Sequence, residues 1–197
     1  MTNINDFVTF WHMTPDRKLA ETEKPFLGCK IYFSNSISGL LNQDPEMGWN
    51  VVNYLIENGA HVLDRHVAGR TGEEKDALFV KDNGFDYRMA ENPKIAVESI
   101  DIAQVDMATH VIAFVDGPSH GVGNEVQRAI DRYEFKGENV QILCLVSEER
   151  AGKLSWMISG KESPKYPIFH LKIYSDLQDA KKHIFEFLNP QGDALQT

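Results

Sequence analysis

The stretch from Asp116 to Glu125 holds the residue types best suited to chemistry. It reads DGPSHGVGNE and follows an apolar run that predicts a buried strand. Gly121 and Gly123 would let a ligand approach the backbone closely, and Ser119 can cap a helix or hold an anion. Glu125 is expected in or near the first turn of the next helix, where the helix dipole favours an ionised carboxylate. A positioned, ionised carboxylate can act as a nucleophile toward a sugar carbon.

This loop also has a plainer interpretation. A GxG pattern before a helix is common, and a glutamate in a first helical turn is often only a partner of the helix dipole. No third glycine completes the GxGxxG spacing of dinucleotide sites, and no GK[ST] sequence indicates a P-loop. The loop therefore argues against these two nucleotide motifs and leaves catalysis open.

The elements that position this loop follow from the apolar pattern. Five apolar runs predict strands at 29–34, 61–64, 110–116, 140–146 and 167–174. Helical patterns occupy 46–58, 73–81, 93–107, 125–135, 154–160 and 177–188. Strands that are apolar throughout and alternate with helices are typical of a parallel sheet covered on both faces. We therefore predict a doubly wound (Rossmann- or flavodoxin-like) α/β fold, with the first strand central and the ligand at the carboxyl ends of the first and third strands.

Length and composition indicate one ordinary globular domain of 197 residues and 22.3 kDa. We expect residues 1–28 to form an arm, poorly structured or packed on the surface. The catalytic domain is expected over 29–189, and a tail over 190–197. Cys29 and Cys144 lie in apolar runs and are expected to be core residues rather than redox or metal groups.

Charge and patterning exclude several functions. A net charge of −9 argues against a nucleic-acid polymer as partner. The amino terminus does not resemble a secretory signal, and no apolar run is long enough to span a bilayer. The histidines show no metal-ligand spacing. We expect a cytoplasmic enzyme with no membrane partner, no metal and no cofactor.

Four segments, in order, resemble the nucleoside 2-deoxyribosyltransferase superfamily. They are KIYFSNSISG, the helix end at Asp101–Met107, DGPSHGVGNE, and ILCLV followed by KLSWMISG. The most similar branch is that of the 2′-deoxynucleoside 5′-phosphate N-hydrolases. The resemblance covers about 29–188, with one apparent insertion around 76–92.

The resemblance implies a role for three residues in the reaction. Glu125 matches the nucleophile that attacks the anomeric carbon, Asp101 the carboxylate that helps the base leave, and Tyr32 the tyrosine that orients the nucleophile. From the pattern alone, a solvated helix residue is the favoured interpretation of Asp101, and a packed core residue is an equal alternative for Tyr32. A leaving base departs better when it is protonated, which a second acid with a raised pKa can achieve.

The resemblance also implies residues for binding. Ser36, Ser119 and Ser155 match hydroxyls associated with a 5′-phosphate, and Ser155 would serve the site of a neighbouring subunit in a homodimer. His66 matches a pocket histidine; an ordinary loop histidine and, for Ser155, a helix cap are the alternatives. The branch usually has an arginine where this chain has Ser38, and the loss of a bidentate contact weakens the expected phosphate binding. The full set of expected substrate-binding residues is Ser36, Ile37, Ser38, Gly39, His66, Asp116, Gly117, Ser119, Gly121, Gly123, Ser155 and Met157.

Three functions remain open at this point. The first is hydrolysis of a (2′-deoxy)nucleoside 5′-monophosphate, which the three serines favour. The second is transfer of a deoxyribose between free bases on unphosphorylated nucleosides. The third is a nucleotide-binding module without turnover, which does not require Tyr32, Asp101 and Glu125 together.

Overall fold

A parallel sheet forms the centre of the molecule, whose computed structural model describes residues 24–36 and 45–190. The sheet has five strands in the order β2-β1-β3-β4-β5, and every neighbouring pair is parallel. Their bounds are β1 Lys30–Ser34, β2 His61–Val62, β3 His110–Phe114, β4 Gln141–Ser147 and β5 Phe169–Tyr174. The predicted α/β class is confirmed, and the order is that of flavodoxin-like sheets. The expectation of a central first strand is wrong: β3 is the middle strand, and β1 lies between β2 and β3.

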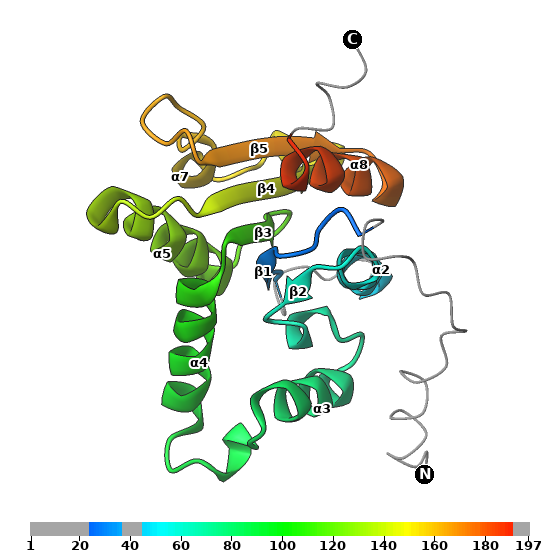
Figure 1. Ribbon diagram of the computed structural model, residues 1–197, viewed down its shortest axis with the longest axis vertical. Helices are drawn as coiled ribbons and strands as arrows, with labels where there is room; N and C mark the ends of the chain where they lie inside the picture. Colours follow the sequence, from blue (N-terminus) through cyan, green and yellow to red (C-terminus); the bar gives the residue numbers. More distant parts are fainter. Residues whose placement is uncertain (1–23, 37–44, 191–197) are drawn as a thin grey trace.

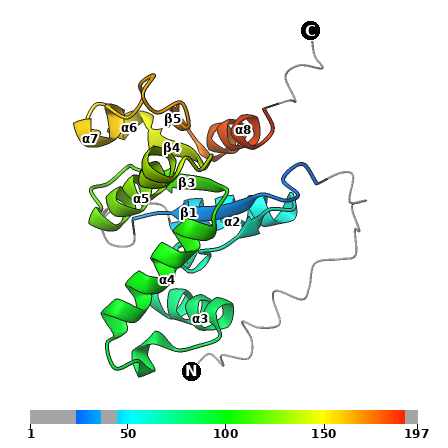
Figure 2. The same cartoon turned by 60° about the vertical axis from the view of Figure 1, so that its left-hand side comes forward.

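Helices cover both faces of this sheet. They are α2 Pro45–Glu57, α3 Gly72–Asn83, α4 Pro93–Met107, α5 His120–Lys136, α6 Glu148–Ala151, α7 Trp156–Ser159 and α8 Leu177–Leu188, with short 3-10 helices η2 His66–Ala68 and η3 Tyr87–Met89. In Figure 1, α4 and α5 lie to the left of the sheet and α2 and α8 to the right, and Figure 2 shows the same layers from another side. The apparent insertion at 76–92 coincides with most of α3 and with η3.

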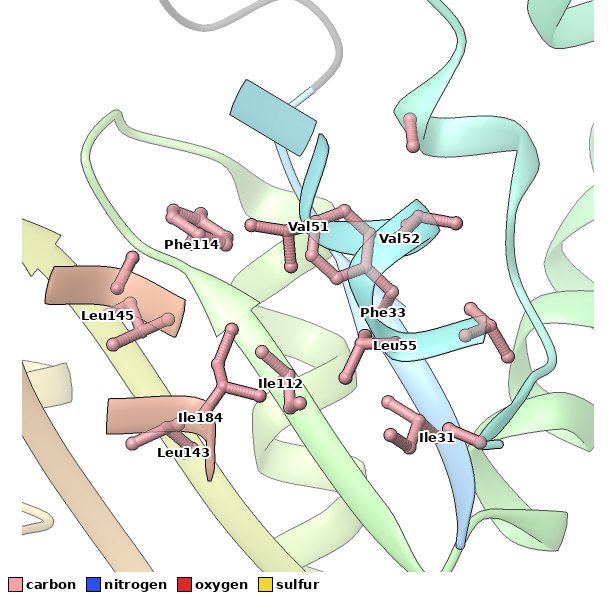
Figure 3. Packing of buried hydrophobic residues seen from close by; sticks show 14 of the residues in the cluster. Ile31, Phe33, Val51, Val52, Leu55, Ile112, Phe114, Leu143, Leu145 and Ile184 are labelled. Carbon is pink, nitrogen blue, oxygen red and sulfur yellow. The ribbon is translucent and has the colours of Figure 1, made fainter. Parts of the chain in front are cut away.

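The face toward α2 and α8 is an apolar core (Figure 3). Ile31 and Phe33 from β1 pack there with residues of both helices, including Val51, Leu55 and Ile184. Because successive strand residues point to opposite faces, the residues between them point toward α4 and α5. The alternation of β1 therefore assigns Tyr32 and Ser34 to the face that α4 and α5 cover.

The packed part of the chain begins before residue 29. Phe26, which falls in the expected arm, is fully buried in the core. Its backbone N–H donates to the carbonyl oxygen of Asn58 at 3.0 Å, just past the end of α2. Residues 1–23 of that arm, and residues 191–197 of the expected tail, lie outside the described part of the chain. Of the two cysteines, Cys144 is fully buried and Cys29 is half-buried, and both are free thiols.

None of the helices within 24–36 and 45–190 has both the length and the apolar character that crossing a membrane requires.

A buried arginine joins α4 to α5. Nη1 of Arg132, on α5, donates to the carbonyl oxygens of Val105 and Ala108 at 2.6 and 2.9 Å, at the carboxyl end of α4. A cation is favourable at this end of a helix, where carbonyl groups lack partners. The contact fixes the two helices that carry the expected catalytic carboxylates relative to each other.

We expect Arg132→Met to lower the free energy of unfolding by about 2–4 kcal/mol, because it removes charged hydrogen bonds from a buried site. Arg128→Met is the matched control. Arg128 lies one turn earlier on α5, is 35% exposed and pairs with Asp106 of α4, so its loss should cost under about 1 kcal/mol. Urea unfolding followed by circular dichroism measures both free energies. Equal losses of stability in the two variants would show that the buried contacts of Arg132 contribute no more than the exposed pair of Arg128.

Candidate active site

Glu125 and Ser34 meet at the carboxyl ends of the central strands. Ser34 is the last residue of β1 and is paired in register with Ala113 of β3. Its hydroxyl donates a hydrogen bond to Oε2 of Glu125, which comes from α5. A Cβ atom on Gly121 would lie 3.6 Å from Oε1 of Glu125 and 3.8 Å from Oγ of Ser119. Ser119 and the carboxylate therefore flank the same glycine, and a ligand can approach both over its backbone.

Glu125 lies deeper in its helix than the sequence predicted. Ser119 caps α5 by accepting a hydrogen bond from the Val122 N–H at 3.3 Å, and the helix begins at His120. The predicted loop at 117–123 is therefore partly helical, and Glu125 lies in the second turn. The helix dipole acts mainly in the first turn, so local hydrogen bonds, rather than the dipole, favour the ionised form.

Opposing effects act on the Glu125 carboxyl group. Burial raises its pKa above the ordinary range, and the negative charge of Asp64 adds to this. The hydrogen bond from Ser34, the nearby Tyr32 hydroxyl and the charge of His66 lower the pKa but do not cancel the rise. Tyr32 is fully buried, and the pKa of its phenol is raised by burial and by the nearby carboxylates. Tyr32 therefore stays a neutral donor next to Glu125.

Asp101 lies on α4 and is not a solvated helix residue. Its Oδ1 atom is buried and has no hydrogen-bond partner among the described residues. Burial, followed by the charge of Asp64, raises its pKa from 3.8 to about 7. Nearby Glu125 raises the pKa further, whereas His66 lowers it. Asp101 can therefore hold a proton at neutral pH while Glu125 has hydrogen bonds that favour its anion.

His66 lies in the same cluster. It begins η2, and its Nδ1 contacts the carboxylate of Asp64, the residue two positions earlier. The ring of Phe79 from α3 packs edge-on against the imidazole, with centroids 5.1 Å apart and planes at 81°. Burial lowers the pKa of His66, but Asp64 and the charge of Asp101 outweigh it, and the net shift is upward.

Ligand atoms of Asp64, His66 and Asp101 lie within 4.8 Å of one another. Among the described residues, this group alone has the spacing that a metal ion would need. Nδ1 of His66 is directed at Asp64, so a metal would compete with an ion pair that already exists. The expected absence of a metal stays a prediction.

Asp116 fixes the loop that follows β3. Its carboxylate accepts hydrogen bonds from the Ser147 backbone N–H at 2.7 Å and from the Tyr174 hydroxyl at 2.9 Å. Its carbonyl oxygen accepts one from Nε of Arg150 at 2.7 Å. Asp116 was expected among the substrate-binding residues; its carboxylate holds the loop to β4 and β5, and the loop then presents Gly117 and Ser119.

The other expected residues fall into three groups. Ser36 is buried next to the end of β1, whereas Ile37, Ser38 and Gly39 lie outside the described residues. Gly123 has open space where a side chain would begin. Ser155 and Met157 belong to the short helix α7 and its cap. Ser155 caps α7 by accepting from the Met157 N–H at 3.2 Å, so the helix-cap interpretation is correct, and its hydroxyl hydrogen stays available to another acceptor.

Three residues of the site are absent from the sequence-based expectations. Ser34 is the final residue of an apolar strand, and the alternation from Tyr32 could have assigned it to the same face. Asp64 ends the second strand run, but nothing in its spacing predicts a contact with His66. Phe79 was also missed, because its segment was treated as an insertion outside the resemblance.

Comparisons with known proteins found relatives that cover most of the chain. No model of a protein family matches the chain. A protein from Nematostella vectensis that carries the name 2′-deoxynucleoside 5′-phosphate N-hydrolase 1 is 30% identical over 161 residues, covering 81% of this chain and 95% of that protein. A 5-hydroxymethyl-dUMP N-hydrolase from Danio rerio is 30% identical over 160 residues, covering 79% of this chain and 92% of the relative. The structure of the CMP N-glycosidase of Clostridium botulinum has a TM-score of 0.51 at 17% identity, over 79% of this chain and 96% of its own, and supports the fold.

The Asp101 pKa predicts how stability depends on pH. An acid whose pKa is raised on folding destabilises the folded state as the pH rises from its unfolded value, 3.8, through about 7. Asp101→Asn should therefore stabilise the protein relative to wild type by about 2–3 kcal/mol more at pH 8 than at pH 5. Urea unfolding at both pH values measures the difference.

Asp106→Asn, on the same helix, is the control. Arg128 lowers the Asp106 pKa, so this group is ionised at both pH values and its substitution should have nearly the same effect at each. If Asp101→Asn behaved like this control, Asp101 would not be a protonated acid at neutral pH.

Proposed function

Because the chain belongs to the family of 2′-deoxynucleoside 5′-phosphate N-hydrolases, we propose that it hydrolyses the N-glycosidic bond of (2′-deoxy)nucleoside 5′-monophosphates with Glu125 as nucleophile. The products are a free base and (deoxy)ribose 5-phosphate. The observation that carries the proposal is the buried carboxylate of Glu125, hydrogen-bonded to Ser34, beside an Asp101 whose pKa is about 7. One carboxyl group thus accepts a hydrogen bond that favours its anion, and the other has a pKa that lets it hold a proton at neutral pH.

In the first step, an oxygen of Glu125 forms a bond to the anomeric carbon while the bond between that carbon and the base nitrogen breaks. The bonding electrons go to the base, and Asp101 supplies the proton that makes the base a neutral leaving group. The transition state has the character of a sugar cation, which a nearby carboxylate stabilises. Tyr32 and Ser34 keep the attacking group in place.

In the second step, water attacks the anomeric carbon of the sugar ester. The bond to Glu125 breaks and returns the carboxylate, and the ionised Asp101 accepts one proton from the water. One water is consumed in total: its hydroxyl group stays on the sugar, and its hydrogen replaces the proton given to the base. Both carboxyl groups return to their starting forms.

The capping serines are suited to a phosphate. Ser119 accepts a backbone N–H through Oγ, and its own hydrogen can then point to an anion. It also caps α5, a helix of 17 residues whose amino terminus favours negative charge. Ser36 and Ser38 would complete the contacts from the loop after β1, with Ser38 a weaker partner than an arginine.

We also propose a homodimer in which Ser155 serves the site of the neighbouring subunit. Trp156 and Met157 follow it on α7 and are 91% and 75% exposed. Large exposed side chains of these types are enriched at interfaces. The dimer would bring the hydroxyl of Ser155, a cap within its own chain, to a phosphate on the partner.

An assay with nucleosides and their 5′-monophosphates, with and without an acceptor base, tests the reaction by chromatography of the products. We expect each monophosphate to have at least about a hundredfold higher kcat/KM than its nucleoside, because hydroxyl contacts to a charged group contribute roughly 1.5–3 kcal/mol each. Glu125→Gln should lower kcat at least about a thousandfold without unfolding.

Other outcomes would contradict the proposal. Faster base exchange than hydrolysis on an unphosphorylated nucleoside would identify a transferase. Glu125→Gln activity within about tenfold of wild type, under ~1.4 kcal/mol of barrier, would exclude Glu125 as the nucleophile. Binding of monophosphates without any release of base would favour a non-catalytic module.

Mixed dimers test the role of Ser155. Glu125→Gln should be inactive, and Ser155→Ala should lose about tenfold or more in kcat/KM. After the two variants are mixed and allowed to exchange subunits, about a quarter of all sites should combine a native Glu125 with a native Ser155 from the partner. Activity should then exceed that of either variant alone. Activity that never exceeds the mean of the two, or a fully active monomer by light scattering, would contradict the shared site.

A further inference from the structure

Asp64 is a buried carboxylate to which the proposed reaction assigns no role. It lies two residues after the short strand β2 and is 1% exposed. Its carboxylate contacts Nδ1 of His66. Burying a charge is unfavourable unless a partner compensates it, and His66 is the partner that contacts this carboxylate.

The arginine next in sequence to Asp64 forms a salt bridge with a different carboxylate. Arg65, the next residue, directs its guanidinium to Asp82 of α3, with Nε 2.9 Å from Oδ2. Among the described residues, His66 is the one cation that forms an ion pair with Asp64. The charge of this ion pair is therefore set by whether the imidazole holds its second proton.

Phe79 isolates the pair from water. It comes from α3, is nearly fully buried, and packs edge-on against His66. Lower exposure to water strengthens the interaction between the imidazole and the carboxylate. It also holds the ring so that Nδ1 stays on Asp64, which leaves Nε2 as the nitrogen free to face other groups.

The pair lies next to the acid of the reaction. One carboxylate oxygen each from Asp64 and Asp101 and one ring nitrogen of His66 all lie within 4.8 Å of one another. Oδ1 of Asp101 is buried without a hydrogen-bond partner among the described residues, which is an environment that disfavours its anion. A second negative charge at this distance disfavours it further.

We propose that Asp64 is a positioning residue that sets the protonation of the leaving-group acid: it fixes His66 through Nδ1 and keeps the Asp101 carboxyl group protonated at neutral pH. The inference rests on the proposed function, because it assigns Asp101 the proton that the base takes. Asp64 itself does not contact the substrate.

The charged groups around Asp101 are mostly carboxylates, which raise its pKa. Asp101 is faced by Asp64 and His66 from the β2 side and by Glu125 from α5, and Glu98 lies on its own helix. Of these, the three carboxylates raise its pKa, Asp64 most, and His66 lowers it.

Around His66, the charged neighbours are Asp64, Asp101 and, from α3, Asp82, and all three raise its pKa against the effect of burial. Removing the charge of Asp64 should therefore lower the pKa of both His66 and Asp101.

NMR of Asp64→Asn tests whether Asp64 fixes His66, and this test does not require enzyme activity. In the wild type, the His66 ring protons should titrate above pH 6.5, with assignment by comparison with His66→Asn. In Asp64→Asn, this pKa should fall by at least about one unit. Wild-type titration below 6.5, or an unchanged value in the variant, would overturn the proposal even if the enzyme were inactive on every substrate tried.

The pH dependence of turnover tests whether Asp64 keeps the Asp101 carboxyl group protonated. Relative to wild type, Asp64→Asn should lose about tenfold or more in kcat at pH 7.5 and less than about threefold at pH 5.5, where Asp101 is protonated in both proteins. KM should change less than about threefold. A loss that is equal at both pH values would indicate a merely structural role and overturn the proposal.

The leaving group gives an independent comparison. A p-nitrophenyl 2-deoxyriboside 5-phosphate releases a stable phenolate that needs no proton, so Asp64→Asn should hydrolyse it at close to the wild-type rate. An equally large loss on this substrate at pH 7.5 would contradict the assignment. Wild-type hydrolysis of neither substrate would instead contradict the proposed function, and leave the NMR result to decide on Asp64.

Two controls complete the design. Asp82→Asn removes a carboxylate that also raises the His66 pKa but pairs with Arg65, and it should keep at least about half of wild-type kcat at pH 7.5. EDTA should leave the wild-type rate unchanged. Stimulation by a divalent cation that disappears in Asp64→Asn would overturn the proposal, because it would assign the cluster to a metal.

Discussion

The structure depends on the burial of three carboxyl groups in one small region. Asp64, Asp101 and Glu125 come from the β2 loop, α4 and α5, and each loses much of its hydration there. Their mutual repulsion would push these elements apart. The parallel pairing of β1 with β3 and the Arg132 contact between α4 and α5 oppose this repulsion. The packing of the fold thus holds these three carboxyl groups close together, although hydration and repulsion favour their separation.

The same burial explains how similar groups take opposite roles. Glu125 accepts a hydrogen bond from Ser34 and has the Tyr32 hydroxyl nearby, and both favour its anion. Asp101 has a buried oxygen with no such donor among the described residues, and its pKa is about 7. In the proposed reaction, local hydrogen bonding rather than the identity of the acid therefore assigns the nucleophile to Glu125 and the proton donor to Asp101. On the side of Asp101, the carboxylate of Asp64 raises its pKa and the charge of His66 lowers it, with Asp64 the larger effect.

The sequence predicted the parts of this account that depend on periodicity or on the resemblance. The apolar runs around Tyr32 and at 110–116 predicted strands, and the resemblance pointed to Asp101 and Glu125. It could not predict that α5 begins at His120, because a Ser119 cap followed by glycines is equally typical of a loop. Contacts between loops distant in sequence, such as the ring of Phe79 on His66, depend on tertiary packing that no local pattern encodes. The central position of β3 likewise depends on strand order, which apolar runs do not specify.

The central claim is that Glu125 becomes covalently bonded to the sugar, and a trapping experiment measures this directly. A 2-deoxy-2-fluoro-arabinosyl nucleoside 5′-monophosphate slows both steps, because fluorine destabilises the sugar cation, and an activated base restores the first step. After incubation, intact-mass and peptide mass spectrometry should show one fluorinated sugar phosphate per active site, attached to the peptide that contains Glu125 and absent from Glu125→Gln. An adduct on another residue, or full base release with inverted configuration at the anomeric carbon and no adduct, would contradict the account.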